Sequence, residues 1–111
     1  MSNGIHTQTA DELLTEVDEF YFGYSSWYFG TERKGDRLEI TLSDPDADDE
    51  STTKDYLVSA TQLKNAFTEA KKRGYHLCCE RDIVEEGIGF GCAQDLGIIV
   101  QTACYGELVF G

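Results

Sequence analysis

The stretch KGDRLEITLSD, residues 34–44, contains the clearest strand pattern in the chain. Leu38, Ile40 and Leu42 alternate with polar residues, which is the period of a β-strand with one buried face. The segment 34–36, Lys-Gly-Asp, has the composition of a turn. We therefore predict a strand that starts after this turn, and a second strand over about residues 55–59.

The segment between these two predicted strands, SDPDADDESTTK, is the most acidic part of the chain. Because strand patterns lie on both sides of it, we interpret it as a hairpin connection and not as a linker between domains. An extended segment carries alternate side chains about 6.6 Å apart, which is sparser than the phosphates of a DNA strand, about 3.4 Å apart. The connection alone is therefore too sparse to imitate DNA, and other acidic surfaces would have to contribute. Its carboxylates are Asp44, Asp46, Asp48, Asp49 and Glu50, and Asp55 follows them.

Three helices are predicted by apolar residues at helical spacing. The first runs over about residues 10–21, after a capping box formed by Thr9 and Glu12. The second follows Ser59 or Thr61 and ends at Gly74, and the third begins near Leu96. The first helix would expose five acids, Asp11, Glu12, Glu16, Asp18 and Glu19. The inner stripe of the second is Leu63, Ala66, Phe67 and Ala70; that of the third is Leu96, Ile99, Val100, Ala103 and Cys104, with Gly106 as its C-terminal cap.

The remaining segments have weaker patterns. Residues 20–29 hold seven of the thirteen aromatic residues, which predicts a core strand from which Tyr24, Trp27 or Tyr28 could be exposed as interface anchors. Residues 75–84 are predicted to be extended, and residues 85–95 to be a glycine-rich connection. About eight residues at the N-terminus are predicted to be mobile. The whole is an α+β fold of one domain, residues 1–111, with an antiparallel sheet of about three to four strands and two to three helices.

The charge of the chain restricts its partners. It carries 21 acidic and 9 basic residues, a formal charge of −12, and 14 of the acids lie in residues 1–60. Bulk attraction to nucleic acid or to an anionic membrane is therefore excluded, and a basic protein partner is expected. Neither a signal peptide nor an apolar stretch of about 18 residues is present, so we expect a cytoplasmic protein.

No catalytic residues, cofactor or metal site are predicted. The glycines of GIGFG lack the lysine and spacing of a phosphate loop. His76 and Cys78 lack an orienting acid, so an enzyme is not expected. The cysteines Cys78, Cys79, Cys92 and Cys104 form no CxxC pair, which predicts small buried apolar side chains and not a zinc site.

A calcium loop is a further interpretation of the acidic connection. Asp44, Asp46 and Asp48 match positions 1, 3 and 5 of an EF-hand loop. Positions 6 and 12, however, hold Asp49 and Asp55 where such loops have glycine and glutamate. A calcium-dependent binding module therefore stays an alternative.

The C-terminal sequence DLGIIVQTACYGELVFG, residues 95–111, resembles the ending of small, acidic, phage-encoded accessory proteins. The resemblance implies a phage or mobile-element origin. Small size, acidity and the lack of catalytic residues are also similar to anti-CRISPR and anti-restriction proteins, several of which block a DNA path by charge mimicry. The matching positions are Gln101, Ala103, Tyr105, Gly106, Glu107, Val109, Phe110 and Gly111.

Our leading hypothesis is a phage-encoded inhibitor of a bacterial defence system, an anti-CRISPR protein that acts in the host cytoplasm. It would cover a basic DNA-recognition surface of an effector subunit with carboxylates, through salt-sensitive association. The alternatives are a structural or regulatory phage protein whose acidity is solubilising, the calcium module, and adaptation to high salt. The predicted contact residues are the acids of residues 44–55 and of the first helix, with Tyr24 and Trp27 at the rim and Glu85-Glu86 as a further contributor.

Overall fold

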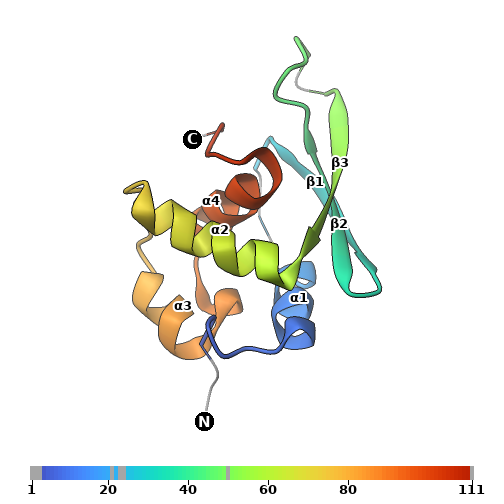
Figure 1. The fold of residues 1–111 in the computed structure, drawn as a ribbon. Coiled ribbons are helices and arrows are strands. Elements are labelled where there is room, and N and C mark those ends of the chain that lie inside the picture. Colours follow the sequence, from blue (N-terminus) through green and yellow to red (C-terminus); the bar gives the residue numbers. More distant parts are fainter. Residues whose placement is uncertain (1–3, 21, 23–24, 50, 111) are drawn as a thin grey trace.

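A computed structural model describes residues 4–20, 22, 25–49 and 51–110, and it shows an α+β fold (Figure 1). The described residues form one three-stranded antiparallel sheet, four α-helices and one 3₁₀ helix. In chain order these are α1 (Ala10–Asp18), β1 (Tyr28–Lys34), β2 (Arg37–Ser43), β3 (Thr53–Ser59), α2 (Ala60–Lys72), α3 (Glu80–Glu86), η1 (Ile88–Phe90) and α4 (Ala93–Tyr105).

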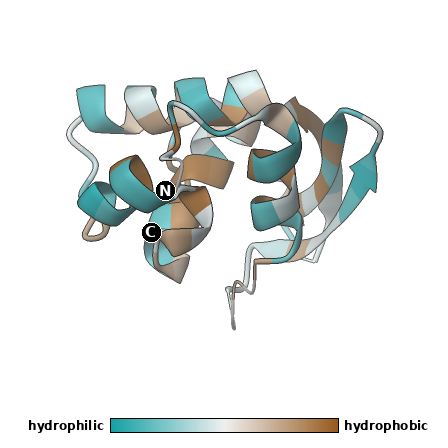
Figure 2. Cartoon of the chain, turned by 90° about the horizontal axis from the view of Figure 1, so that it is seen from below, coloured by the Kyte–Doolittle hydropathy of each residue, from teal (hydrophilic) through white to brown (hydrophobic). Residues whose placement is uncertain are grey.

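The sheet has the order β1-β2-β3, and the predicted hairpin around the acidic connection is confirmed. Its register pairs Arg37 with Ser59 at one end and Ser43 with Thr53 at the other. Gly35 has φ +62° in the turn between β1 and β2, a conformation that favours glycine. The apolar residues of β2 are fully buried on one face, and none of the helices formed by the described residues covers the opposite face (Figures 1 and 2).

Helices α1, α2 and α4 all pack against the sheet, and α2 and α4 pack against each other. The stripe of α2 predicted from the sequence is buried, and Phe67 is its largest side chain. Ser59 forms the predicted capping box with Gln62, and Gly74 has φ +78° after the C-terminal end. In α4, the predicted αL cap at Gly106 is confirmed. Local spacing and capping thus placed α2 correctly, whereas α4 begins at Ala93, earlier than the predicted start near Leu96. The predicted connection over residues 85–95 is accordingly wrong in part, because it contains the end of α3, all of η1 and the first residues of α4.

The aromatic segment before β1 differs from its prediction. Helix α1 ends at Asp18, because the chain then turns to pack Phe22 against Tyr28, with ring centroids 4.4 Å apart. No described residue before Tyr28 is part of a strand, so the predicted core strand over residues 20–29 is wrong for that part of the segment. Trp27 is 8% exposed, and it packs edge-on to Phe22 with ring centroids 6.0 Å apart. Its predicted role as an exposed anchor is therefore wrong, and Tyr24 and Tyr21 lie outside the described residues.

Residues 75–84 also differ from their prediction, because their second half forms helix α3 instead of an extended segment. Ile83 of this helix is fully buried, and its carbonyl accepts the backbone N–H of Ile5, 3.0 Å away. Ile83 therefore faces the core from a short helix, whereas the neighbouring Val84 is exposed. The preceding turn depends on a distant partner, the carboxylate of Asp95, which accepts the backbone N–H groups of Cys78 and Cys79.

Residues 4–8, expected from the sequence to be mobile, are packed against the helices. Ile5 is fully buried and Gln8 is 3% exposed. The side-chain oxygen of Gln8 accepts the backbone N–H of Ile88 at 3.0 Å. The backbone carbonyl oxygen of Gln8 accepts a hydrogen bond from the ammonium group of Lys64 at 2.8 Å. The segment thus joins α2 to η1.

Candidate functional site

The acidic connection between β2 and β3 is shaped by two of its own carboxylates. The backbone N–H of Asp46 donates to the side chain of Asp44 at 3.0 Å, and that of Ser51 donates to the side chain of Asp49 at 2.9 Å. The bonds from Ser51 hold the pKa of Asp49 below its usual value. Both bonds are typical of Asx turns, which shape a loop through its own side chains. Asp46 and Asp48 are exposed at its surface, and Glu50 lies outside the described residues.

A second group of acids lies on the face of the sheet that no helix covers. Cross-strand partners point to the same face, so the register places Glu32 and Glu39 side by side and Leu57 beside Glu39. Thr41 donates from its hydroxyl to Asp55 at 2.6 Å, two pairs closer to the acidic connection and on the same face. Leu57 is 52% exposed. We call Glu32, Glu39, Asp55 and Leu57 the acidic sheet face. The alternation in the sequence indicated which residues point outward, but only the strand register of the structure shows that Glu32 and Glu39 are neighbours.

The Glu32–Glu39 pair gives a testable prediction about the stability of the sheet. Like charges on directly opposed residues destabilise a sheet, and Lys34 offsets only part of this, through an exposed bond of 3.3 Å to Glu32. We expect Glu39→Gln to raise the free energy of unfolding by about 0.5 kcal/mol. Urea unfolding measures the change, with Glu107→Gln, an exposed acid after α4, as the matched control. An unchanged or lowered stability would contradict the repulsion.

The acids of α1 do not extend this surface as the sequence suggested. Glu16 accepts the backbone N–H of Gly89 at 2.7 Å and the amide of Gln8 at 2.6 Å, so its carboxylate joins α1 to η1. Asp11 pairs with Arg33 at 3.0 Å, and Glu12 completes the capping box. Arg33 lies next to the β1–β2 turn, so α1 and the acidic connection lie at opposite ends of the sheet (Figure 1). The acids of α1 and those of residues 44–49 therefore do not form one continuous face, and this separation favours a solubilising role for the acids of α1. Asp18 is partly buried and Glu19 is exposed.

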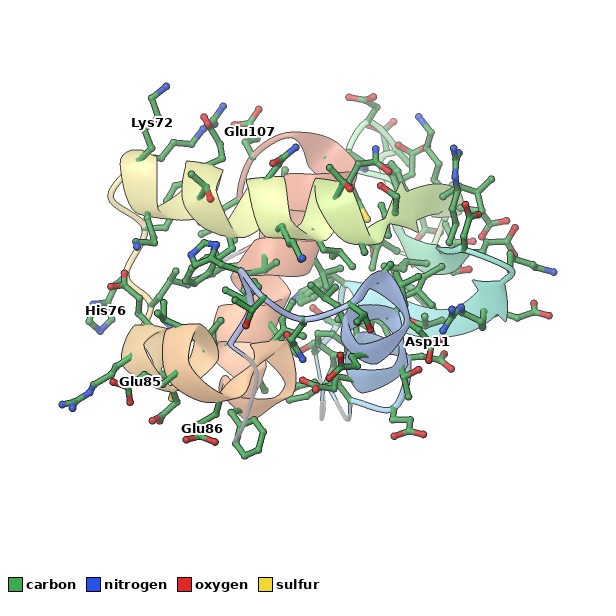
Figure 3. All side chains as sticks on the ribbon, turned by 60° about the horizontal axis from the view of Figure 1, so that its bottom comes forward. Asp11, Lys72, His76, Glu85, Glu86 and Glu107 are labelled. Carbon is green, nitrogen blue, oxygen red and sulfur yellow. The ribbon has the colours of Figure 1, made fainter. Side chains whose placement is uncertain are left out.

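The predicted contribution of Glu85-Glu86 is also separate from the sheet. Both residues lie in α3, and their side chains point away from the body of the protein (Figure 3). Glu85 pairs with Arg81 at 3.3 Å. In Figure 1, α3 lies across the molecule from β3. Glu85 and Glu86 therefore lie on a different surface from the acidic sheet face.

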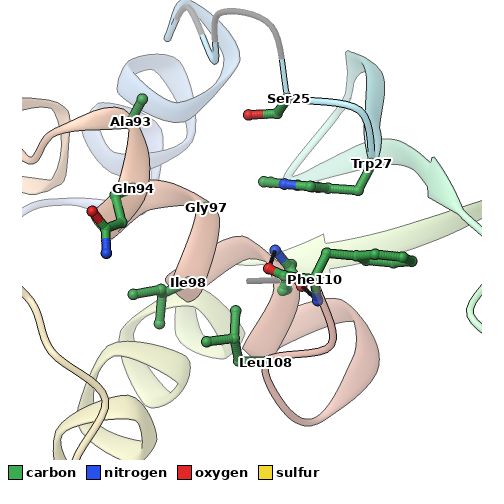
Figure 4. A pocket seen from close by; sticks show the side chains of 9 residues that line it. Ser25, Trp27, Ala93, Gln94, Gly97, Ile98, Leu108 and Phe110 are labelled. Carbon is green, nitrogen blue, oxygen red and sulfur yellow. Dashed lines mark hydrogen bonds between the residues drawn. The ribbon is translucent and has the colours of Figure 1, made fainter.

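Trp27 lines a pocket of about 520 Å³ between α4 and the C-terminal segment (Figure 4). Gly97 allows the indole to approach α4, since a Cβ there would lie 2.9 Å from the ring. Gln101 closes one side and binds the backbone of Val109 and Phe110. The lining residues are Ser25, Trp27, Ala93, Gln94, Gly97, Ile98, Gln101, Leu108 and Phe110. Since none of them is titratable, they offer no acid–base catalyst.

The cysteines are more exposed than the sequence predicted. Cys78 is exposed, and the other three are partly buried. Hydrogen bonding with Cys92 and Cys79 raises the pKa of Cys78 to about 12, so this thiol is protonated at neutral pH and is a weak nucleophile. The sulfur of Cys78 contacts Cys79, Cys92 and Asp95, a grouping that the sequence reasoning missed. The signal available was the adjacent Cys78-Cys79 pair together with the spacing Cys92-x-x-Asp95.

The calcium interpretation gains no support from the described residues. The only group of three or more potential metal ligands that they bring together is Cys78, Cys79, Cys92 and Asp95. Asp55 lies in β3, where an EF-hand would begin a helix, and it is bonded to Thr41. Within the same described part of the chain, no helix has the length and apolar character that a membrane crossing requires.

Comparisons of the chain with protein-family models, curated proteins and solved structures found no match.

Proposed function

We propose that this protein is a binding protein whose acidic sheet face and acidic connection engage a basic surface of another protein. The observation that supports this most directly is the position of Glu39 and Asp55 on the uncovered side of the hairpin that ends in Asp46 and Asp48. The described carboxylates of the hairpin and of its connection therefore belong to one β2–β3 hairpin. A lysine- and arginine-lined groove is the complementary partner.

The dimensions and chemistry of the hairpin suit a surface that normally holds a nucleic-acid strand. The seven residues of β2 span about 20 Å, which corresponds to about six phosphates of one DNA strand. Leu57, together with Phe29 on edge strand β1, supplies exposed apolar area, 52% and 49% exposed respectively. A few apolar contacts surrounded by charge are typical of a specific, salt-sensitive protein interface.

The particular function that we propose is inhibition of a bacterial defence complex, of the anti-CRISPR kind, by a phage-encoded protein in the host cytoplasm. It combines the charged hairpin with the resemblance of residues 95–111 to phage accessory proteins. The target would be a CRISPR effector subunit, and the inhibitor would occupy its DNA-recognition groove stoichiometrically. Nucleic acid itself is not bound, because the charges repel it.

The test reverses charge on the hairpin, with the triple variant Glu39→Lys/Asp46→Lys/Asp48→Lys. Like charges placed across an interface cost several kcal/mol, so we expect at least about 100-fold weaker binding to the effector and loss of inhibition of DNA cleavage. Surface plasmon resonance with purified CRISPR effector complexes, at two salt concentrations, measures the affinity. Affinity of the unaltered protein should fall as salt rises.

The matched control is Asp82→Lys/Glu85→Lys/Glu86→Lys, which makes the same change of net charge on α3. It should keep affinity within about threefold, because α3 lies across the molecule from β3 (Figure 1) and salt screens charges beyond a Debye length of about 10 Å. Equal losses in both variants would indicate a solubilising role for the charge. Failure of the unaltered protein to bind any effector tested would contradict the anti-CRISPR assignment.

A further inference from the structure

Three thiols and one buried carboxylate meet where α3 and α4 begin. The sulfur of Cys78 lies 3.1 Å from that of Cys92, 3.8 Å from that of Cys79 and 3.5 Å from Oδ1 of Asp95. One ligand atom of each of the four residues lies within 4.8 Å of all the others. We call these four residues the thiol cluster. Residues up to 17 positions apart in the chain form it, so it depends on the tertiary fold.

The sequence around the thiol cluster holds its members in place. Cys79 directly precedes α3, and Cys92 is the N-cap of α4, where its sulfur accepts the backbone N–H of Asp95 at 3.4 Å. Asp95 is fully buried, and its two oxygens accept the backbone N–H groups of Cys78 at 3.1 Å and Cys79 at 2.7 Å. The carboxylate thus fixes two adjacent cysteines against the start of α4 while Oδ1 faces the sulfur of Cys78.

We propose that the thiol cluster is a zinc site, in which the sulfurs of Cys78, Cys79 and Cys92 and Oδ1 of Asp95 are the four ligands. Tetrahedral zinc with Zn–S of about 2.3 Å and Zn–O of about 2.0 Å separates two sulfurs by about 3.8 Å and a sulfur from an oxygen by about 3.5 Å. The distances from Cys78 to Cys79 and to Asp95 match these values. The distance from Cys78 to Cys92 needs to open by less than about 1 Å.

The chemistry of the ligands favours zinc over the other ions. Thiolates select zinc over calcium and magnesium, which require oxygen ligands, and zinc accepts sulfur and oxygen together in a closed tetrahedral site. The spacing Cys92-x-x-Asp95 is also that of paired zinc ligands around a turn. A disulfide between Cys78 and Cys92 is the competing arrangement, but it leaves the thiol of Cys79 and the position of Asp95 without a role.

Zinc at this position would connect the segment after α2 to the first turn of α4. Since Cys78 is exposed, the ion could be exchanged and removed by chelators. The thiol cluster lies at the α3 side of the molecule, away from the hairpin proposed to bind a partner (Figure 1). An experiment that tests the zinc site is therefore independent of the experiment that tests the proposed function.

The experiment is a titration of the chelator-treated, reduced protein with Co²⁺, followed by displacement with Zn²⁺. We expect one Co²⁺ per chain, with the visible bands of tetrahedral cobalt and thiolate-to-cobalt charge transfer whose intensity corresponds to three sulfurs. Zinc should abolish the bands and raise the melting temperature. Calcium should leave the melting temperature unchanged.

The decisive variant is Cys92→Ser, because serine keeps an N-cap acceptor for α4 while removing a thiolate ligand. We expect at least about 100-fold weaker metal binding, with unchanged far-ultraviolet circular dichroism. The matched control is Cys104→Ala, which removes the one cysteine outside the cluster and should bind cobalt as the unaltered protein does. Asp95→Asn should keep the charge-transfer bands and shift the visible ones.

Three results would overturn the proposal. One is the lack of tetrahedral cobalt bands in the reduced protein. Another is equal cobalt affinity of Cys92→Ser and the unaltered protein. The third is a Cys78–Cys92 disulfide, found by peptide mapping under non-reducing conditions, in protein that binds no metal after reduction. A spectrum of Asp95→Asn identical to that of the unaltered protein would contradict the fourth ligand.

Discussion

Replacement of Phe67 by alanine is expected to lower the free energy of unfolding by about 4 kcal/mol. Phe67 is fully buried in α2, and it is the largest side chain buried to that degree. His6 packs against its ring with centroids 5.9 Å apart, and the ammonium of Lys71 lies 5.3 Å from its centroid. The substitution removes the apolar burial and leaves a cavity between α2 and its neighbours, and both effects destabilise the fold.

Urea unfolding followed by circular dichroism measures this loss, provided that the slope of the transition is unchanged. Phe90→Ala is the matched control, because the ring of Phe90 is 57% exposed. We expect the control to change stability by less than about 1 kcal/mol. Comparable losses for the two phenylalanines would show that the core is not centred on α2. Since domains of this size are stabilised by about 5–15 kcal/mol, Phe67→Ala could also leave a measurable unfolded fraction.

The second large effect is expected from Gln8→Ala, a loss of about 3 kcal/mol. Gln8 is almost completely buried, and its side chain accepts a bond from Ile88 and donates one to the carboxylate of Glu16. Alanine would leave the N–H of Ile88 without an acceptor and would weaken the pairing of Glu16. A buried polar group without a partner costs about 1–3 kcal/mol, and bonds to charged groups are the stronger ones.

Gln94→Ala is the matched control for this prediction, since Gln94 is an exposed residue of α4. Its effect should stay within about 0.5 kcal/mol. Hydrogen exchange adds a local measurement, because loss of the Gln8 bonds should expose the amide of Ile88 in particular. An effect of Gln8→Ala no larger than that of the control would show that residues 4–8 are only loosely attached.

Local patterns were sufficient for the hairpin and for two helices. The alternation of Leu38, Ile40 and Leu42 placed β2, and the cap at Ser59 with the stripe through Phe67 placed α2. These features are contained within a few neighbouring residues, so propensity, period and capping agree. The same reasoning failed for α3, where a short apolar segment fits a strand or a helix equally well by period.

The sequence by itself determined the α+β class, the hairpin around the acidic connection, and the large excess of negative charge. Only the tertiary structure decided which acids share a surface, because charges such as Glu32 and Glu39 become neighbours through strand register. It also decided that Trp27 is buried, that Glu16 binds Gly89 across 73 residues, and that three cysteines meet around Asp95. Each of these depends on packing between distant segments, which local period and composition do not encode.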